Sequence, residues 1–203
     1  MQSEWVYMNN QIDFYFDIIS PFSFIAHKKI QKIKQNKKIV FNYKPIFLGG
    51  LHKLAEIDAP AFNKYKIKIL QSDCELVAEK NNISFTWNSK FPINSLYLMR
   101  GYLYVDDNHK NDYLDAFFDA YWKDNLDLSD EIEVNKILKY LNIDSKKFFE
   151  GINNQIVKDN LKKLTSNAFE KELFGAPTFV ANNKIFWGQD RLEYAIEELN
   201  LIK

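Results

Sequence analysis

The sequence predicts an α/β protein in which a long helical segment separates two parts of one sheet. Short aromatic or β-branched runs at 12–16 and 39–43 are typical of strands, and a helical pattern lies between them. Residues 60–173 follow mainly helical patterns, after which strand patterns return at 178–181 and 184–187. With 203 residues, this order of elements suits one domain with a large insertion.

The first helix is predicted to begin directly after Ser20. Pro21 suits the first helical position, because its missing N–H would have no partner there. The apolar residues of this helix recur at helical spacing: Phe22, Ala26, Ile30 and Ile33. A strand, a helix and a second strand in this order are typical of a parallel β-α-β unit, from which Gly49-Gly50 is the expected exit.

The central helices and the last elements are predicted from spacing, caps and turns. Helical segments are expected at 60–80, 92–105, 111–123, 130–140 and 145–173, the last with a break. Ser129-Asp130 and Asp144-Ser145 are candidate N-caps. Asn182-Asn183 tolerates the positive φ of a tight hairpin, and a final helix is expected at 191–199.

Composition excludes several classes of function. Lys and Arg together number 27, as do Asp and Glu, so the charge does not indicate a general nucleic-acid or anionic-membrane surface. No apolar run approaches the ~20 residues of a membrane span and no signal peptide is apparent, so a cytoplasmic location is expected. The single cysteine, Cys74, excludes an intramolecular disulfide and a multi-cysteine metal site, and no metal is expected.

Four segments in order carry a pattern that spans most of the chain. They are FYFDIISPFS (14–23), YKPIFLGG (43–50, with Pro60 and Lys66 downstream), FPIN (91–94), and FGAPTFV (174–180) followed by FWGQDRL (186–192). Together they resemble the 2-hydroxychromene-2-carboxylate isomerases and the related kappa-class glutathione transferases, of the DsbA-like superfamily. The resemblance implies a thioredoxin-like fold with a large all-helical insertion. Residues 1–48 and 166–203 would form the thioredoxin-like domain, and residues 49–165 the helical insertion.

Ser20 is the predicted catalytic residue. The resemblance implies that its hydroxyl hydrogen-bonds the sulfur of bound glutathione. A thiol of the cysteine type has a pKa near ~8.5, and a hydroxyl donor at a helix N-terminus favours the thiolate and lowers that pKa. A serine before proline is also an ordinary N-cap, so both interpretations stand. Because neither Ser20 nor Ser23 can form a disulfide, thiol–disulfide oxidoreductase activity is excluded.

The resemblance assigns further residues to glutathione. Pro177 would be a cis-proline, and the backbone of Ala176 would pair with the tripeptide as an added strand. Gln189 and Asp190 would hold the γ-glutamyl end, and Asp190 is alternatively the N-cap of the last helix. Lys66 would pair with the glycyl carboxylate, with solvated surface as the alternative.

Other positions concern the substrate or depart from the family pattern. Phe22, Asn94 and Trp187 are expected to face the substrate. Where relatives have an asparagine, this chain has Ile57, followed by Asp58, so one polar contact to glutathione is lost or relocated. Cys74 is interpreted as a small core residue, and His27, His52 and His109 are interpreted as structural or surface positions. Of these, His27 lies on the helix that Ser20 starts.

The resemblance therefore implies a glutathione-dependent isomerase acting on an unsaturated aromatic or keto acid. The thiolate of glutathione would add reversibly to a conjugated carbonyl, and its expulsion after bond rotation would release the isomer. Two alternatives stay open: a kappa-class-like glutathione transferase, and a redox-inactive thioredoxin-fold protein that binds peptides or a partner. A homodimer is implied by the resemblance, and neither nucleic acid nor membrane is expected as a partner.

Overall fold

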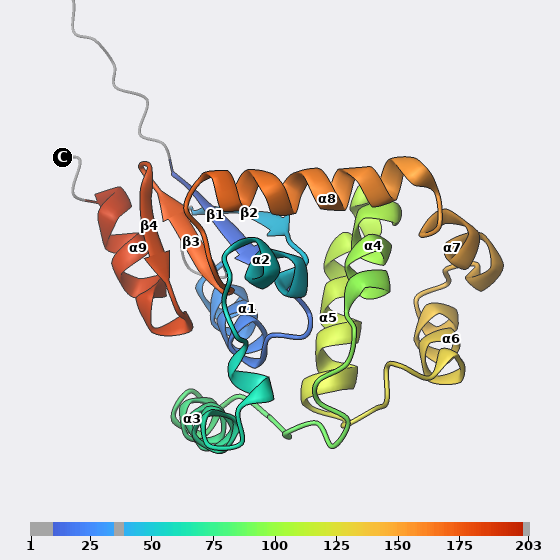
Figure 1. Ribbon diagram of the computed structural model, residues 1–203, viewed down its shortest axis with the longest axis horizontal. Helices are drawn as coiled ribbons and strands as arrows, with labels where there is room; N and C mark the ends of the chain where they lie inside the picture. The colour runs from blue at the N-terminus through green and yellow to red at the C-terminus, as the bar shows by residue number, and fades with distance from the viewer. Residues whose placement is uncertain (1–9, 35–38, 201–203) are drawn as a thin grey trace, which may run out of the picture.

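The structure is a computed structural model that describes residues 10–34 and 39–200. In this part of the chain, four strands form one sheet in the order β2-β1-β3-β4 (Figure 1). The strands are β1 (Gln11–Phe16), β2 (Val40–Pro45), β3 (Thr178–Ala181) and β4 (Lys184–Trp187). Strands β1 and β2 are parallel, whereas β3 is antiparallel to both β1 and β4. The order confirms the predicted β-α-β unit, helical block and closing hairpin.

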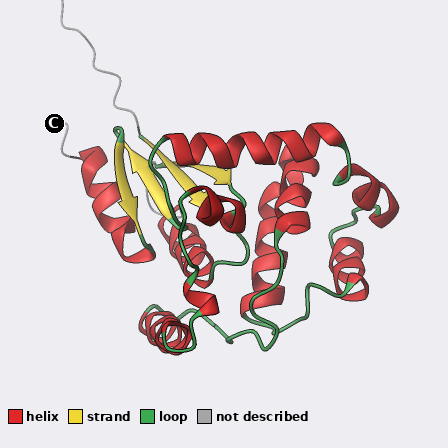
Figure 2. Ribbon diagram, in the orientation of Figure 1, coloured by secondary structure: helices red, strands yellow, loops and turns green. Residues whose placement is uncertain are grey.

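Helices make up most of the remaining described chain (Figure 2). They are α1 (Pro21–Lys34), α2 (Leu48–Leu54), α3 (Lys66–Lys80), α4 (Leu96–Tyr104), α5 (Lys110–Trp122), α6 (Glu131–Tyr140), α7 (Ser145–Gly151), α8 (Gln155–Glu170) and α9 (Leu192–Asn200). Short 3-10 turns lie at Pro60–Phe62, Asp107–His109 and Gln189–Arg191. The predicted caps Asp130 and Asp144 accept hydrogen bonds from the first turns of α6 and α7.

Three predicted boundaries are wrong. Gly49-Gly50 does not leave the β-α-β unit but lies in α2, a helix that the sequence analysis missed. The segment at 60–80 is interrupted because the Asn63 side chain accepts hydrogen bonds from the N–H groups of Tyr65 and Lys66, where α3 begins. The segment at 92–105 begins late, since the Asn94 side chain accepts from the N–H of Leu96 at the start of α4.

Side chains of β1 alternate between two apolar layers, as the period of 2 in a strand requires. Ile12, Phe14 and Phe16 belong to the main core, where the Phe14 ring stacks on Phe179 with 5.4 Å between centroids. Tyr15 belongs to a second cluster that includes residues of α2 and α8. Helices therefore cover both faces of the sheet. Their packing fixes the position of the turn where β1 ends and α1 begins.

The helical block extends to one side of the sheet. Helices α4 to α7 lie beside it, and α8 runs from α7 back over the sheet (Figure 1). The division into 1–48, 49–165 and 166–203 stays a prediction, and α8 runs without interruption through residue 165. Across residues 10–34 and 39–200, no helix has the length and apolar character needed to cross a bilayer.

Candidate active site

Ser20 lies at the turn between β1 and α1 and caps the helix. Its Oγ accepts a hydrogen bond from the N–H of Ser23 at 3.2 Å, as an N-cap side chain does. The same hydroxyl donates to the carbonyl of Ala176 at 2.9 Å. The N-cap interpretation is therefore correct, and it leaves a polarised hydroxyl at the positive end of α1.

The Ala176–Pro177 peptide bond is cis, as expected from the resemblance. The carbonyl of Pro177 accepts a hydrogen bond from the N–H of Gly188 at 2.9 Å, which ties the chain before β3 to the chain after β4. A Cβ built on Gly175 would lie 2.7 Å from Nε1 of Trp187, so glycine permits a close approach of this half-exposed ring. These contacts hold the Ala176 carbonyl against Ser20.

A second cis bond, Phe91–Pro92, lies in another segment of the site and was not predicted. It precedes Ile93 and Asn94, which both line the site. The Asn94 side chain also accepts the hydrogen bond that starts α4. This segment therefore joins the helical block to the site.

These segments surround a cavity of about 740 Å³, a size typical of small-molecule sites. Six of the residues predicted from the sequence line it: Ser20, Phe22, Lys66, Asn94, Ala176 and Trp187. Further aromatic walls that the sequence analysis did not assign come from Phe47, Phe62, Phe91 and Phe174. The cavity is thus a mainly apolar chamber that contains the Ser20 hydroxyl.

Three predicted residues lie outside the lining. Pro177 is one, and the other two, Gln189 and Asp190, follow Trp187 closely in the chain. Gln189 is buried, and its Oε1 has no hydrogen-bond partner among the described residues. The Asp190 side chain is 57% exposed and lies 3.4 Å from the guanidinium of Arg191. Asp190 is inside the 3-10 turn that Gly188 precedes, so it is not the N-cap that the sequence allowed.

Asp17 is a buried acid next to the site that the sequence analysis did not assign. Its Oδ2 accepts hydrogen bonds from the N–H of Leu48 at 2.8 Å and from the Ser95 hydroxyl at 2.9 Å. Its Oδ1 accepts from the N–H of Ile19 at 3.1 Å. Burial raises the pKa of Asp17 to about 6, against the effect of these hydrogen bonds. The carboxyl joins the Ser20 turn to the starts of α2 and α4.

Three ionisable side chains line the cavity: His52, Asp58 and Lys66. Burial lowers the pKa of His52, so its imidazole is neutral at neutral pH. The position of His52 in the cavity lining differs from the structural or surface position expected from the sequence. Ile57, the residue that departs from the family pattern, also lines the cavity, as does the adjacent Asp58.

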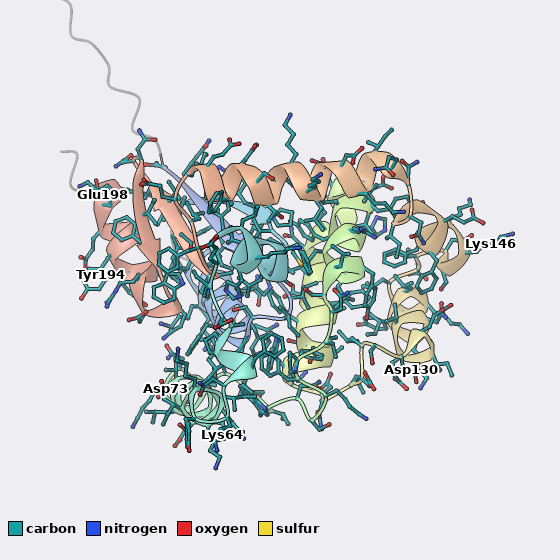
Figure 3. The ribbon with its side chains drawn as sticks, viewed as in Figure 1. Lys64, Asp73, Asp130, Lys146, Tyr194 and Glu198 are labelled. Atoms are coloured by element: carbon teal, nitrogen blue, oxygen red, sulfur yellow. The ribbon has the colours of Figure 1, made fainter. Side chains whose placement is uncertain are left out.

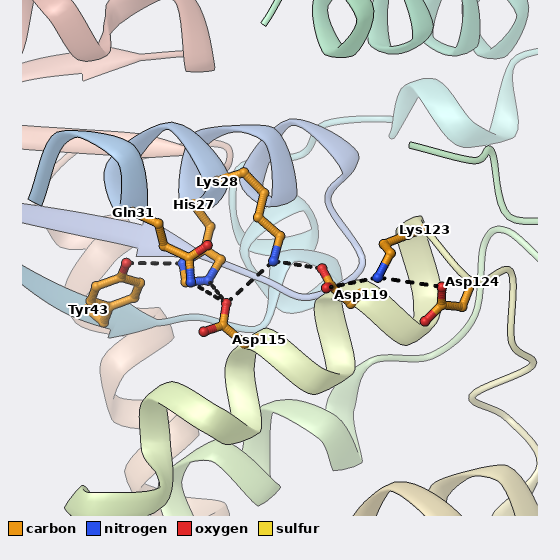
Figure 4. A network of polar contacts seen from close by, with 8 residues as sticks. All are labelled: His27, Lys28, Gln31, Tyr43, Asp115, Asp119, Lys123 and Asp124. Carbon is orange, nitrogen blue, oxygen red and sulfur yellow. Dashed lines mark hydrogen bonds and ion pairs between the residues drawn. The ribbon is translucent and has the colours of Figure 1, made fainter. Parts of the chain in front are cut away.

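His27 and Cys74 have structural surroundings. The His27 ring contacts the Tyr43 hydroxyl at 3.0 Å and Asp115 at 2.6 Å, and neighbouring Lys28 pairs with Asp119 at 2.7 Å (Figure 4). This network joins α1 to β2 and α5, and His27 does not line the cavity. Cys74 is fully buried in α3, and burial followed by the charges of its acidic neighbours raises the pKa of its thiol. The prediction that Cys74 is a core residue is confirmed.

Comparisons of the sequence and of the structure with known proteins agree with one another. The family model of the DSBA-like thioredoxin domain matches residues 11–200. Over 189 residues the chain is 27% identical to the 2-hydroxychromene-2-carboxylate isomerase of Sphingobium xenophagum, covering 92% of this chain and 96% of that protein. Over 77 residues it is 36% identical to glutathione S-transferase kappa 1 of Caenorhabditis elegans, covering 37% and 34% of the two chains.

The solved structure of a 2-hydroxychromene-2-carboxylate isomerase superposes on this chain with a TM-score of 0.85. The alignment covers 95% of each chain at 23% identity, so it establishes the fold. The predicted thioredoxin-like fold with a large helical insertion is confirmed, and so is the resemblance to this group of isomerases.

Proposed function

Because this chain belongs to the family of DSBA-like thioredoxin domains, we propose that it is a glutathione-dependent isomerase of the 2-hydroxychromene-2-carboxylate isomerase type. Curated relatives named as isomerases match most of the chain and support an enzyme. One observation carries the proposal: the Ser20 hydroxyl, at the N-terminus of α1 and 2.9 Å from the Ala176 carbonyl, lines an apolar cavity. A hydroxyl at this point can bind a thiolate but cannot form a disulfide with it.

The residues around the cavity fit glutathione. A volume of about 740 Å³ suits a tripeptide together with a small acid. Gln189 Oε1, outside the cavity lining but two residues after Trp187, is a buried acceptor without a described partner, which an ammonium group could satisfy. The exposed amine of Lys66 suits a carboxylate, and the backbone at Ala176 offers polar groups beside the cavity.

When bound, glutathione would supply a thiolate that adds reversibly to a conjugated carbonyl substrate. Ser20 would turn its hydroxyl from the Ala176 carbonyl to the sulfur, while the N–H of Ser23 continues to donate to Oγ. Accepting that bond makes the hydroxyl a stronger donor. The aromatic walls, including Phe22 and Trp187, would exclude water, and Asn94 would hydrogen-bond a substrate carboxylate.

The first experiment is thermal unfolding of the wild-type protein with and without millimolar reduced glutathione. A ligand at ~100 times its dissociation constant stabilises by about 2.7 kcal/mol, or roughly 5–10 °C for a chain of this size. We expect Asp190→Ala to reduce the shift. Asp144→Ala, which removes a remote N-cap, controls for general destabilisation and should keep the shift. Absence of any shift in the wild type would refute glutathione binding.

A glutathione transferase is the second candidate, favoured by the partial match to the kappa-class protein. Stoichiometry separates the two activities, because an isomerase leaves the concentration of free glutathione unchanged and a transferase consumes it. We also propose a cytoplasmic location, since a site for reduced glutathione suits a reducing compartment.

A further inference from the structure

Two side chains of the helical block hold the turn that carries Ser20. The indole Nε1 of Trp122, at the end of α5, donates to the carbonyl of Ile18 at 2.8 Å. The Sδ of Met99, on α4, accepts the N–H of Ile18 at 3.3 Å. All three residues are fully buried, so loss of either contact would leave a polar backbone group unpaired. Both backbone polar groups of Ile18, two positions before Ser20, are therefore bound to the helical block.

Two further hydrogen bonds complete the turn from within. The N–H of Ile19 donates to the Asp17 carboxyl at 3.1 Å, and the N–H of Ser20 donates to the Asp17 carbonyl at 3.0 Å. The peptide units Asp17–Ile18 and Ile18–Ile19 thus each have one polar group bound inside the turn and the other bound to the helical block. Rotation of either unit would break two hydrogen bonds at once, so both orientations are fixed.

The turn and its two anchors belong to different parts of the fold. Figure 3 shows Tyr194 of α9 and Lys146 of α7 at opposite ends of the molecule, with the sheet toward the first and the helical block toward the second. Met99 and Trp122 are 81 and 104 positions from Ile18 in the sequence. The orientation of the turn therefore depends on how the helical block packs against the sheet.

Trp122 also contacts a wall of the cavity. Its ring lies 5.4 Å from the ring of Phe91, measured between centroids, and Phe91 lines the cavity. The Trp122 ring also stacks on Phe85, with 5.8 Å between centroids and 10° between the ring planes. A buried indole usually pairs its N–H, and here the acceptor is in the Ser20 turn. One side chain thus restrains both this turn and an aromatic wall of the same cavity.

We infer that Trp122 is a positioning residue for Ser20, with Met99 as the second anchor of the turn. This role rests on the proposed function, in which the Ser20 hydroxyl binds the thiolate of glutathione. A hydrogen bond to a thiolate depends on distance and direction, and a displacement of about 1 Å can reduce a rate by about 100-fold. The contacts of Ile18 to the helical block hold the hydroxyl in place before the ligand arrives.

The first test measures the pKa of the thiol of bound glutathione, from the ultraviolet absorbance of its thiolate over a range of pH. Trp122→Phe keeps an aromatic ring but removes the N–H that donates to Ile18. We expect this thiol pKa to rise by about one unit. Trp87→Phe is the matched control, because the Trp87 ring lies 5.7 Å from that of Trp122 and its N–H has no hydrogen-bond partner within residues 10–34 and 39–200. It should leave the thiol pKa unchanged.

A second variant keeps the test valid if Trp122→Phe does not fold. Met99→Leu conserves the volume of the side chain and removes the sulfur that accepts the N–H of Ile18. It should raise the thiol pKa in the same direction. Leu98→Met exchanges the same two residue types at the adjacent buried position of α4, away from the turn, and should have no effect.

Hydrogen exchange tests the restraint without glutathione. The N–H groups of Ser20 and Ser23 donate inside the turn, to the Asp17 carbonyl and to the Ser20 hydroxyl. Both should exchange about tenfold faster in Trp122→Phe and in Met99→Leu than in their controls. The N–H groups in the middle of α1 should keep their wild-type rates, which separates a loosened turn from a general loss of stability.

The outcomes distinguish the two proposals. A wild type whose added glutathione shows no extra thiolate would refute the proposed function, and the exchange rates would then decide the role of Trp122. This role is wrong if Trp122→Phe and Trp87→Phe shift the thiol pKa equally or not at all. It is also wrong if the N–H groups of Ser20 and Ser23 exchange at the same rates in Trp122→Phe as in Trp87→Phe.

Discussion

Replacing Asp17 by Asn should change how stability depends on pH. Burial raises the pKa of Asp17 from 3.8 to about 6 in the folded protein. Between these two values the folded state binds more protons than the unfolded state, so the wild type loses stability as pH rises. At about 1.4 kcal/mol per pH unit, Asp17 removes about 2.5 kcal/mol of stability between pH 4 and pH 7.5. An asparagine does not titrate, so this loss should be absent from the variant.

The substitution also has a cost that is independent of pH. The two carboxyl oxygens of Asp17 accept from the N–H groups of Leu48 and Ile19, and a protonated carboxyl still has acceptor capacity on its hydroxyl oxygen, whereas an amide has only one accepting oxygen. One buried N–H therefore loses its partner, at about 1–3 kcal/mol. We expect Asp17→Asn to be less stable than the wild type at pH 4 and to match or exceed it at pH 7.5.

Urea unfolding at a series of pH values, followed by far-UV circular dichroism, measures this difference directly. Other titrating groups contribute equally to both proteins and cancel in the comparison. Asp13→Asn, on strand β1 just before Asp17 and partly exposed, controls for the change of residue type. Parallel stability curves for the wild type and Asp17→Asn from pH 4 to pH 7.5 would contradict the assignment of Asp17 as a buried acid with a raised pKa.

Four further outcomes are expected. Ser20→Ala should lose about 1 kcal/mol in urea unfolding, because it removes an N-cap, and should lower turnover. Ser23→Ala should not destabilise, since the buried Ser23 hydroxyl has no described partner; equal effects of the two substitutions would argue against a special role for Ser20. Gly175→Ala should displace the half-exposed Trp187 ring and weaken the thermal response to glutathione with a smaller change in stability; an unaltered response would count against the cavity wall described. Cys74 should react with a thiol reagent only after unfolding, and a fast reaction in the native protein would contradict its burial.

Much of the fold could be predicted from local sequence patterns. The strand periods, the N-caps Asp130 and Asp144 and the positive φ of Asn182 and Asn183 are properties of contiguous residues, and the structure has them. The missed helix α2 shows where such patterns fail. Its two glycines favour a turn, but the buried Asp17 carboxylate accepts the N–H of Leu48 where α2 begins. That partner is 31 positions away in the sequence.

The features of the site likewise divide into those that the sequence determined and those that only the tertiary structure decided. The sequence by itself determined that Ser20 stands at a helix start without a cysteine, and the resemblance added a cis bond before Pro177. Only the tertiary structure decided that these two meet, since Ser20 and Ala176 are 156 positions apart. It also decided that Asp17 lies beneath the turn and that His52 lines the cavity. Helix starts and turns depend on neighbouring residues, whereas a cavity and the burial that shifts a pKa depend on which distant segments pack together.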